Sequence, residues 1–515
     1  MSDTSSGPDP EILTEAGPSA AGATVLPAED AGSHRAAGSR KRGLVIGGAV
    51  LGAALLCGAG FAVAQVLSGG GAQPEDVLPS GVVAFADIDL DPSAAQKVDA
   101  LRFLHSFPQV KDVAGSSDDL RETLVSALFG HRTDIDAATQ IEPWLGDRAG
   151  IAALREGSDL ELVGVVQTTD TDKAQQSLDQ ILASQRSGMS VGYAVSGDYV
   201  VIARSTAEAR SIVAAGQQNP LSQDSAFTAA FDGLGDGVAS FYVDASALKG
   251  VTSLSGEPVP TGQLAELTAD GTAAGIVRFD PDAVELLAQA SGASTQAVAS
   301  EPTSLVATLP GSTMVAVGAA SPTSAVSEGL DRLLKRLDST TGMDTAAMLQ
   351  RQYGLRLPQD LVTFFGSDRV LAIDGPADGT MAGLPSIGYR SITDPAAAAG
   401  LVHRIEPLVS QVTGGFGLIA RPTSDGLVMA TTPQYAAALS AGDGDLGTTQ
   451  AFQDAVPDAD GASAIAFVDV DRLSAMLHAL EPGVHTANID PVQAVGASVT
   501  VDGDTTSYRV RLTLG

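Results

Sequence analysis

An uninterrupted apolar run near the N-terminus, from Gly43 to Leu67, constrains this chain more than any other feature. The run reads GLVIGGAVLGAALLCGAGFAVAQVL, which is 25 residues with Gln65 as the one strongly polar side chain. At about 1.5 Å of rise per residue, a helix of this length crosses a hydrocarbon core of about 30 Å. The sequence therefore predicts one transmembrane helix over residues 43–67.

Basic residues stand on one side of the run only. Arg40, Lys41 and Arg42 abut its N-terminal end, and the next basic residue on the other side is Lys97. Positive charge marks the cytoplasmic flank of a membrane helix. We therefore expect a single-pass protein of the cell membrane, with a cytoplasmic N-terminus and an extracytoplasmic C-terminal bulk.

A cleaved signal peptide is the competing interpretation, because Ala62-Val63-Ala64 fits a small-x-small cleavage site. The run is long for a signal peptide, and the tail before it is extended, so an anchor is favoured. Whether the span is ever cleaved after Ala64 stays open.

Gly48 and Gly52 form a GxxxG pair within the run. Such spacing lets two membrane helices approach closely, which makes these glycines candidates for transmembrane packing and a homodimer. In a run so rich in Gly and Ala, the pattern also arises by chance.

The segments on either side of the run lack apolar periodicity. Residues 1–42 are rich in Ser, Gly, Ala and Pro, which is typical of a disordered cytoplasmic tail. Residues 68–77 predict a short tether. The one cysteine, Cys57, lies inside the run, so the remainder of the chain contains no disulfide.

The chain carries a formal net charge of −32, and residues 1–42 contribute only six acidic and four basic side chains to it. Almost all of the negative charge therefore lies beyond the apolar run. Such a domain is repelled by nucleic acid and by anionic lipid headgroups, so we expect no nucleic-acid partner.

Five stretches recur in the same order about 225 residues apart, which predicts an internal duplication. The pairs are LPSGVVAFADIDLDPSAAQKV with LPGSTMVAVGAASPTSAVSEGL, GDRAGIAAL with GSDRVLAID, LVGVVQTTDTDKAQQSLDQIL with SIGYRSITDPAAAAGLVHRIEPL, AFTAAFDGLGDGVASFYVDASAL with AFQDAVPDADGASAIAFVDVDRL, and IVRFDPDAVELL with SVTVDGDTTSYRV. The boundaries that follow are a first copy at 78–290, a linker at 291–304 and a second copy at 305–515.

Local patterns predict an α+β module with mainly antiparallel strands and flanking helices. Strands are expected at 160–167, 199–203 and 238–243, and helices at 173–186 and 325–337. Ser205 and Asp394 are expected as helix N-caps. Tight turns such as Ser196-Gly197-Asp198 favour hairpins over a doubly wound parallel sheet.

The LPSGVVAFADIDL, FYVDASAL and FVDVDRL segments, together with the apolar anchor, resemble the bacterial domain of unknown function family 3352. The resemblance covers essentially the whole chain beyond the span. It implies an envelope location, and it brings no established activity, cofactor or catalytic residue.

The short motifs that resemble sites of known chemistry are better explained by structural roles. Residues 442–447 fit GxGxxG, but they follow a helical stretch rather than a strand, which indicates a surface loop. Asp87, Asp89 and Asp91 lack the spacing of a calcium loop and suit capping of the next helix. No catalytic, cofactor or metal residues are therefore assigned.

Asp147-Arg148 and Asp368-Arg369 recur at matching positions where strands are expected to begin. A structural ion pair is one interpretation. The alternative makes Arg148 and Arg369 a pair of ligand-facing residues, because a guanidinium grips carboxylates with two hydrogen bonds.

Three classes of function remain open. We expect a non-catalytic binding or interaction module of the cell envelope, with an envelope protein or a cell-wall component as partner. A carrier or sequestering domain for an apolar or lipid ligand is the first alternative. An enzyme of unrecognised chemistry is the second, and a cluster of perturbed titratable groups would favour it.

Overall fold

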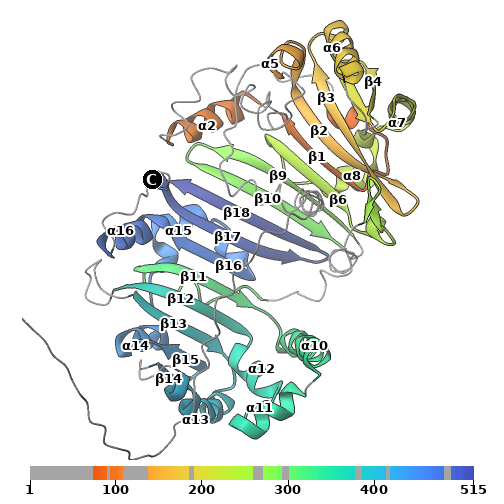
Figure 1. The fold of residues 1–515 in the computed structure, drawn as a ribbon. Coiled ribbons are helices and arrows are strands. Elements are labelled where there is room, and N and C mark those ends of the chain that lie inside the picture. The colour runs from red at the N-terminus through yellow and green to blue at the C-terminus, as the bar shows by residue number, and fades with distance from the viewer. Residues whose placement is uncertain are drawn as a thin grey trace, which may run out of the picture.

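The computed structural model describes residues 73–89, 93–107, 137–184, 191–258, 271–292, 301–342, 344–376, 385–412, 418–480 and 489–515. They form a mixed α/β fold around one large sheet, whose strand pairs are antiparallel except for β3 with β7 (Figure 1). The predicted α+β class with mainly antiparallel strands is confirmed. The predicted span at 43–67, with Gly48 and Gly52, lies outside the described residues, and within them no helix has the length and apolar character to cross a bilayer.

The first half of the sheet is built from residues before 292. Its strands follow the spatial order β4, β5, β3, β2, β1, β6, β9, β10. Their bounds are β1 Ala84–Asp89, β2 Leu145–Glu156, β3 Asp159–Thr168, β4 Gly192–Ser196, β5 Tyr199–Ala203, β6 Ala239–Asp244, β9 Thr272–Asp280 and β10 Ala283–Ser291, and a small hairpin of β7 (Ser253–Leu254) and β8 (Glu257–Pro258) extends β3.

The second half has the spatial order β14, β15, β13, β12, β11, β16, β17, β18, which repeats the order of the first half strand for strand. The bounds are β11 Thr313–Ala320, β12 Asp368–Pro376, β13 Pro385–Ile392, β14 Ile419–Pro422, β15 Gly426–Ala430, β16 Ala464–Asp469, β17 Val492–Asp502 and β18 Thr505–Leu514.

The two halves join through one strand pair, β10 with β18, which we call the seam. Nine antiparallel residue pairs run from Ala283 opposite Thr513 to Ser291 opposite Thr505, with Leu287 opposite Arg509 at the centre. Both strands are the last of their half, so the sheet passes from one half into the other without a break (Figure 1).

The helices flank the sheet. In the first half, α7 lies against β4 and β5, and α2 and α8 lie against β9 and β10; the helices of the second half lie around β11–β18 (Figure 1). Their bounds are α2 Ala94–His105, α5 Ala137–Gln140, α6 Thr171–Ser184, α7 Thr206–Gln218, α8 Ser225–Ala230, α10 Thr323–Thr341, α11 Thr345–Tyr353, α12 Gln359–Phe365, α13 Pro395–Val412, α14 Pro433–Ala441, α15 Gln450–Ala455 and α16 Val470–Leu480, with short 3-10 turns η1 Pro74–Asp76, η2 Leu221–Gln223, η3 Ser246–Leu248, η5 Leu446–Thr448 and η6 Ala459–Gly461.

Helix starts follow the predicted chemistry at two positions and depart from it at a third. Ser205 accepts a hydrogen bond from the Glu208 amide at 3.2 Å, and Asp394 accepts one from the Ala397 amide at 2.7 Å. Ser93, rather than an aspartate of β1, caps α2. The capping role expected for Asp87 and Asp89 is wrong, because both side chains are engaged within the sheet.

Each half has its own core on the same side of the sheet. In the first half, Phe227 packs edge-on against Phe85 and Tyr242, and Tyr199 is fully buried. In the second half, Phe452 packs edge-on against Phe467. Trp144 is 2% exposed within a smaller cluster and donates its indole N–H to the Gln140 carbonyl at 2.6 Å.

Charged side chains cluster at the seam, on the side of the sheet that carries the two cores. Glu285 of β10 is 0% exposed, and it binds Arg278 of β9 at 2.6 Å and, across the seam, Arg509 and Arg511 of β18 at 3.1 and 3.3 Å. Arg511 also contacts Asp280, and Arg509 lies 3.6 Å from Asp458. Three cations and three anions thus balance each other, which makes burial of the carboxylate tolerable.

Removing one partner of this network should weaken the whole fold. Glu285→Gln leaves three arginines without their central anion, so we expect the free energy of unfolding to fall by about 3 kcal/mol. The measurement is urea unfolding of the full-length chain, with Glu328→Gln on the exposed side of α10 as the control, which should change stability by less than about 0.5 kcal/mol. Equal midpoints for the two variants would contradict the role of the seam network.

Candidate functional site

The two arginines singled out by the sequence have different surroundings. Arg148 is 4% exposed, and its Nε lies 3.0 Å from Asp89 Oδ2. Arg369 is half-buried; its Nη1 donates to the Ser321 hydroxyl at 2.9 Å, and its guanidinium lies 5.8 Å from the centre of the Phe365 ring. The geometry thus gives Arg148 the ion pair of the structural interpretation, whereas Arg369 has no carboxylate among these contacts. Whether either residue faces a ligand stays a prediction.

Carboxyl groups with raised pKa values lie beside Arg148. Burial and the neighbouring charge of Asp87 raise the pKa of Glu75, in η1, to about 7. Burial raises the pKa of Asp87 to about 6, against the opposing effect of the Ser240 hydroxyl, which donates a hydrogen bond to it. The sequence analysis missed Glu75, because η1 and β1 meet only through the fold.

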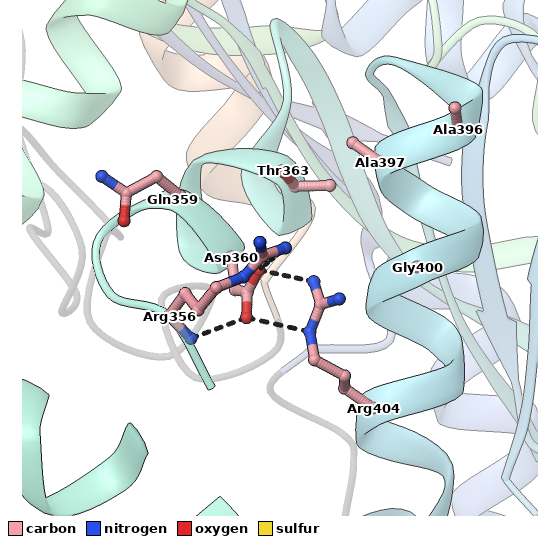
Figure 2. A pocket seen from close by; sticks show the side chains of 8 residues that line it. All are labelled: Arg356, Gln359, Asp360, Thr363, Ala396, Ala397, Gly400 and Arg404. Atoms are coloured by element: carbon pink, nitrogen blue, oxygen red, sulfur yellow. Dashed lines mark hydrogen bonds and ion pairs between the residues drawn. The ribbon is translucent and has the colours of Figure 1, made fainter. Parts of the chain in front are cut away.

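A surface pocket of about 430 Å³ lies between the start of α12 and the first turns of α13 (Figure 2). It is lined by Arg356, Gln359, Asp360, Thr363, Ala396, Ala397, Gly400 and Arg404. Asp360 is 3% exposed and accepts hydrogen bonds from Arg404 Nη2 at 2.6 Å, Arg404 Nε at 3.2 Å and the Arg356 amide at 2.8 Å.

The chemistry of this pocket is that of a filled ion pair. Because the Asp360 carboxylate already accepts hydrogen bonds on both oxygens, it is poorly placed to take a proton from a ligand. The Arg356 side chain is 62% exposed and lies 3.7 Å from the carboxylate, so it is the group that an anion entering the pocket would meet. The ion pair of Asp360 with Arg404 connects α12 to α13, so a structural role explains this pocket better than a catalytic one.

An unusual surface is the side of the sheet that faces away from the two cores, which we call the open face. Residues opposite one another in antiparallel strands place their side chains on the same face. One row of opposite residues therefore crosses nine strands, and every member is apolar: Ile88, Ala239, Val277, Leu286, Val510, Ala497, Ala466, Val317 and Leu371.

A second row runs beside the first and is equally apolar. It consists of Ile151, Ala86, Phe241, Gly275, Ala288, Tyr508, Val499, Ala464 and Ala319. Gly275 is required here, because a Cβ at this position would lie 2.5 Å from the Phe241 ring. With strands about 4.8 Å apart, each row is about 40 Å long.

Large side chains on this face are exposed to solvent. Val317 is 54% exposed, Leu371 51%, Ile151 45%, Tyr508 44% and Val510 39%. Helices cover the face elsewhere: Phe103 of α2 packs with Phe279 on β9, and Phe364 of α12 stacks on Tyr389 of β13 at 4.5 Å. Exposed apolar side chains on neighbouring strands are unusual on a folded domain, so the open face is a candidate binding surface.

The remaining sequence motifs have structural explanations. Gly442 ends α14 in a left-handed conformation, and Asp445 accepts a hydrogen bond from the Gly311 amide at 2.7 Å, as suits the predicted surface loop. Asp458 accepts a hydrogen bond from the Ser498 hydroxyl at 2.7 Å. Across the described ranges, no three His, Cys, Asp or Glu side chains are grouped to hold a metal ion.

The carboxyl cluster near Arg148 predicts a pH-dependent stability. Folding raises the pKa of Glu75 from 4.5 to about 7 and the pKa of Asp87 from 3.8 to about 6. Between these unfolded-state and folded-state pKa values, the folded chain therefore binds more protons than the unfolded chain. Stability contributed by these groups is therefore present at low pH and is lost as the pH rises through the folded-state values.

Replacing either carboxyl group by its amide should reduce the loss of stability that accompanies a rise in pH. We expect Glu75→Gln and Asp87→Asn to raise the urea midpoint of the full-length chain at pH 8 and to change it much less at pH 4.5. Asp236→Asn, in an exposed loop, is the control and should show no such difference between the two pH values. Variants that are destabilised equally at both pH values would contradict the account.

Comparison with known proteins gives one match. A family model described as "Protein of unknown function (DUF3352)" matches residues 43–373, which is more than half of the chain. No curated protein and no solved structure matches. The match ends at residue 373 and so does not include the FVDVDRL segment, but it confirms the family identified from the sequence: the chain belongs to the DUF3352 family of proteins of unknown function.

Proposed function

We propose that this chain is a membrane-anchored, extracytoplasmic binding module that performs no covalent chemistry, and that the open face is its binding surface. The observation that carries the proposal is the pair of apolar rows across the seam, with Val317 and Leu371 about half exposed. A sheet that merely needed solubility would place polar side chains there, as half-buried antiparallel sheets ordinarily do.

Two observations support the membrane anchor. The match to the family model begins at Gly43, which is the first residue of the apolar run, so the run belongs to what family members share. Arg40, Lys41 and Arg42 lie immediately before it. An anchored domain with its bulk outside the membrane follows from the positive-inside rule.

An internal duplication is part of the proposal. The five recurring stretches of sequence correspond to strands that have the same spatial order in both halves. The seam supports it further, because β10 and β18 are the equivalent last strands of the two copies and pair about a central position, Leu287 opposite Arg509. Such a pairing is self-complementary, as in a two-fold symmetric contact.

The enzyme alternative has weaker support. The cluster of Glu75, Asp87 and Asp89 belongs to the first half only. The alignment that places Leu78 beside Leu309 makes Gly318 and Ala320 the counterparts of Asp87 and Asp89, so the second half has no such carboxyl groups there. A carrier of an apolar ligand is the stronger alternative, because both rows of the open face are uncharged.

The topology is testable with paired fusions. Alkaline phosphatase joined after Gly515 should be active, because the enzyme folds only outside the cytoplasm, whereas the same enzyme joined after Arg42 should be inactive. Protease added to intact spheroplasts should remove the bulk of the chain. An inactive fusion after Gly515, together with full protection from protease, would overturn the proposed anchor and orientation.

A further inference from the structure

We infer that the open face binds the hydrocarbon chain of a phospholipid, with the lipid phosphate at Arg369. This inference rests on the proposed membrane anchor and names the ligand of the proposed binding surface. It combines the apolar rows, the position of one arginine at their end, the charge of the chain and the length of its tether.

The chemistry of the rows fits a hydrocarbon. Their members carry no charged side chain, and the tyrosine hydroxyl of Tyr508 is their one polar side-chain group. Backbone groups in the middle of the sheet pair with neighbouring strands, so among the described strands a peptide could add as a strand at an edge, such as β4 or β14, but not over the rows. The part of a ligand that lies over the rows must therefore bind through apolar contacts.

Arg369 stands where the second row ends. It lies opposite Ala319 on β11 and two residues before Leu371, so its side chain shares the open face with both rows. One guanidinium nitrogen donates to Ser321, and the planar group lies over Phe365. The other guanidinium donors are suited to a phosphate, which arginine binds with paired hydrogen bonds. An apolar strip that ends in a cation matches an amphipathic ligand.

Charge argues against a second copy of the chain and against nucleic acid as occupants. With a net charge of −32, a second copy of the chain would be repelled, and the two apolar rows carry no charged side chain to offset that repulsion. Nucleic acid is excluded for the same reason. A lipid with a zwitterionic headgroup supplies hydrocarbon and a phosphate without adding net negative charge.

The tether places such lipids within reach. Gln73, the first described residue, lies six residues beyond Leu67 at the end of the apolar run. At about 3.5 Å per extended residue, the fold begins within about 20 Å of the bilayer. Lipids of that membrane are therefore present at a high local concentration around the fold.

Photo-crosslinking tests the inference directly. The full-length chain is reconstituted into phosphatidylcholine vesicles that contain a trace of phosphatidylcholine with a diazirine at the end of one acyl chain. After illumination and digestion, we expect lipid adducts on peptides of β11, β12 and β18 as well as on residues 43–67. Adducts confined to residues 43–67 would overturn the inference and leave the anchor intact.

Matched variants identify the surface. Leu371→Glu and Val317→Glu should each reduce the strand adducts at least tenfold without changing those on the apolar run. Leu333→Glu on α10 is the control, because Leu333 is 51% exposed, as is Leu371. Unchanged urea midpoints show that the variants fold. Strand adducts that persist in both open-face variants would overturn the inference.

The phosphate contact has its own pair of variants. Arg369→Gln should lower the strand adducts several-fold, whereas Arg332→Gln, on the exposed surface of α10, should not. Equal yields from these two variants would remove the phosphate from the inference. A chain that neither floats with the vesicles nor acquires adducts on residues 43–67 would instead refute the proposed anchor.

Discussion

The pairing of β10 with β18 is the interaction on which the rest of the structure depends. It converts two halves, each with its own core, into one sheet, and it places the apolar rows of one half in line with those of the other. The network around Glu285 stabilises this pairing from the covered side, because a buried carboxylate that binds arginines on both β9 and β18 is satisfied only while the strands remain paired.

An antiparallel sheet ordinarily places apolar side chains toward the core and polar side chains toward solvent. Part of this sheet has the reverse arrangement. Buried charges such as Glu285 and the pair of Arg148 with Asp89 point toward the side on which the cores lie, whereas the open face is apolar and partly exposed. Burying charge has a free-energy cost that ion pairing offsets. Exposed apolar surface carries a further cost, which binding of an apolar ligand would relieve.

Much of the local structure could be predicted from the sequence because it depends on neighbouring residues. The strand expected at 199–203 coincides with β5, and the caps at Ser205 and Asp394 form as predicted. Gly197, in the predicted hairpin turn, has a positive φ. These features depend on intrinsic backbone preferences, which a sequence displays directly.

The surfaces could not be predicted, because they depend on contacts distant in the chain. Asp360 and Arg404 are 44 residues apart, and Glu285 and Arg511 are 226 apart. The open face also lacks a sequence signal: strands such as β17 (VQAVGASVTVD) alternate between residues that are small or apolar on both sides, so their periodicity does not distinguish a covered face from an exposed one.

The most direct test of this account is a disulfide across the seam. In a chain with Cys57 replaced by Ser, Ala288→Cys and Tyr508→Cys stand opposite each other on the open face, within the Cα separation that a disulfide bridges. Mild oxidation should give an intramolecular crosslink at high yield, whereas Ala288→Cys with Ser507→Cys, whose side chains lie on opposite faces, should stay reduced. Free thiols at both positions of the first pair would contradict a continuous sheet and, with it, the open face.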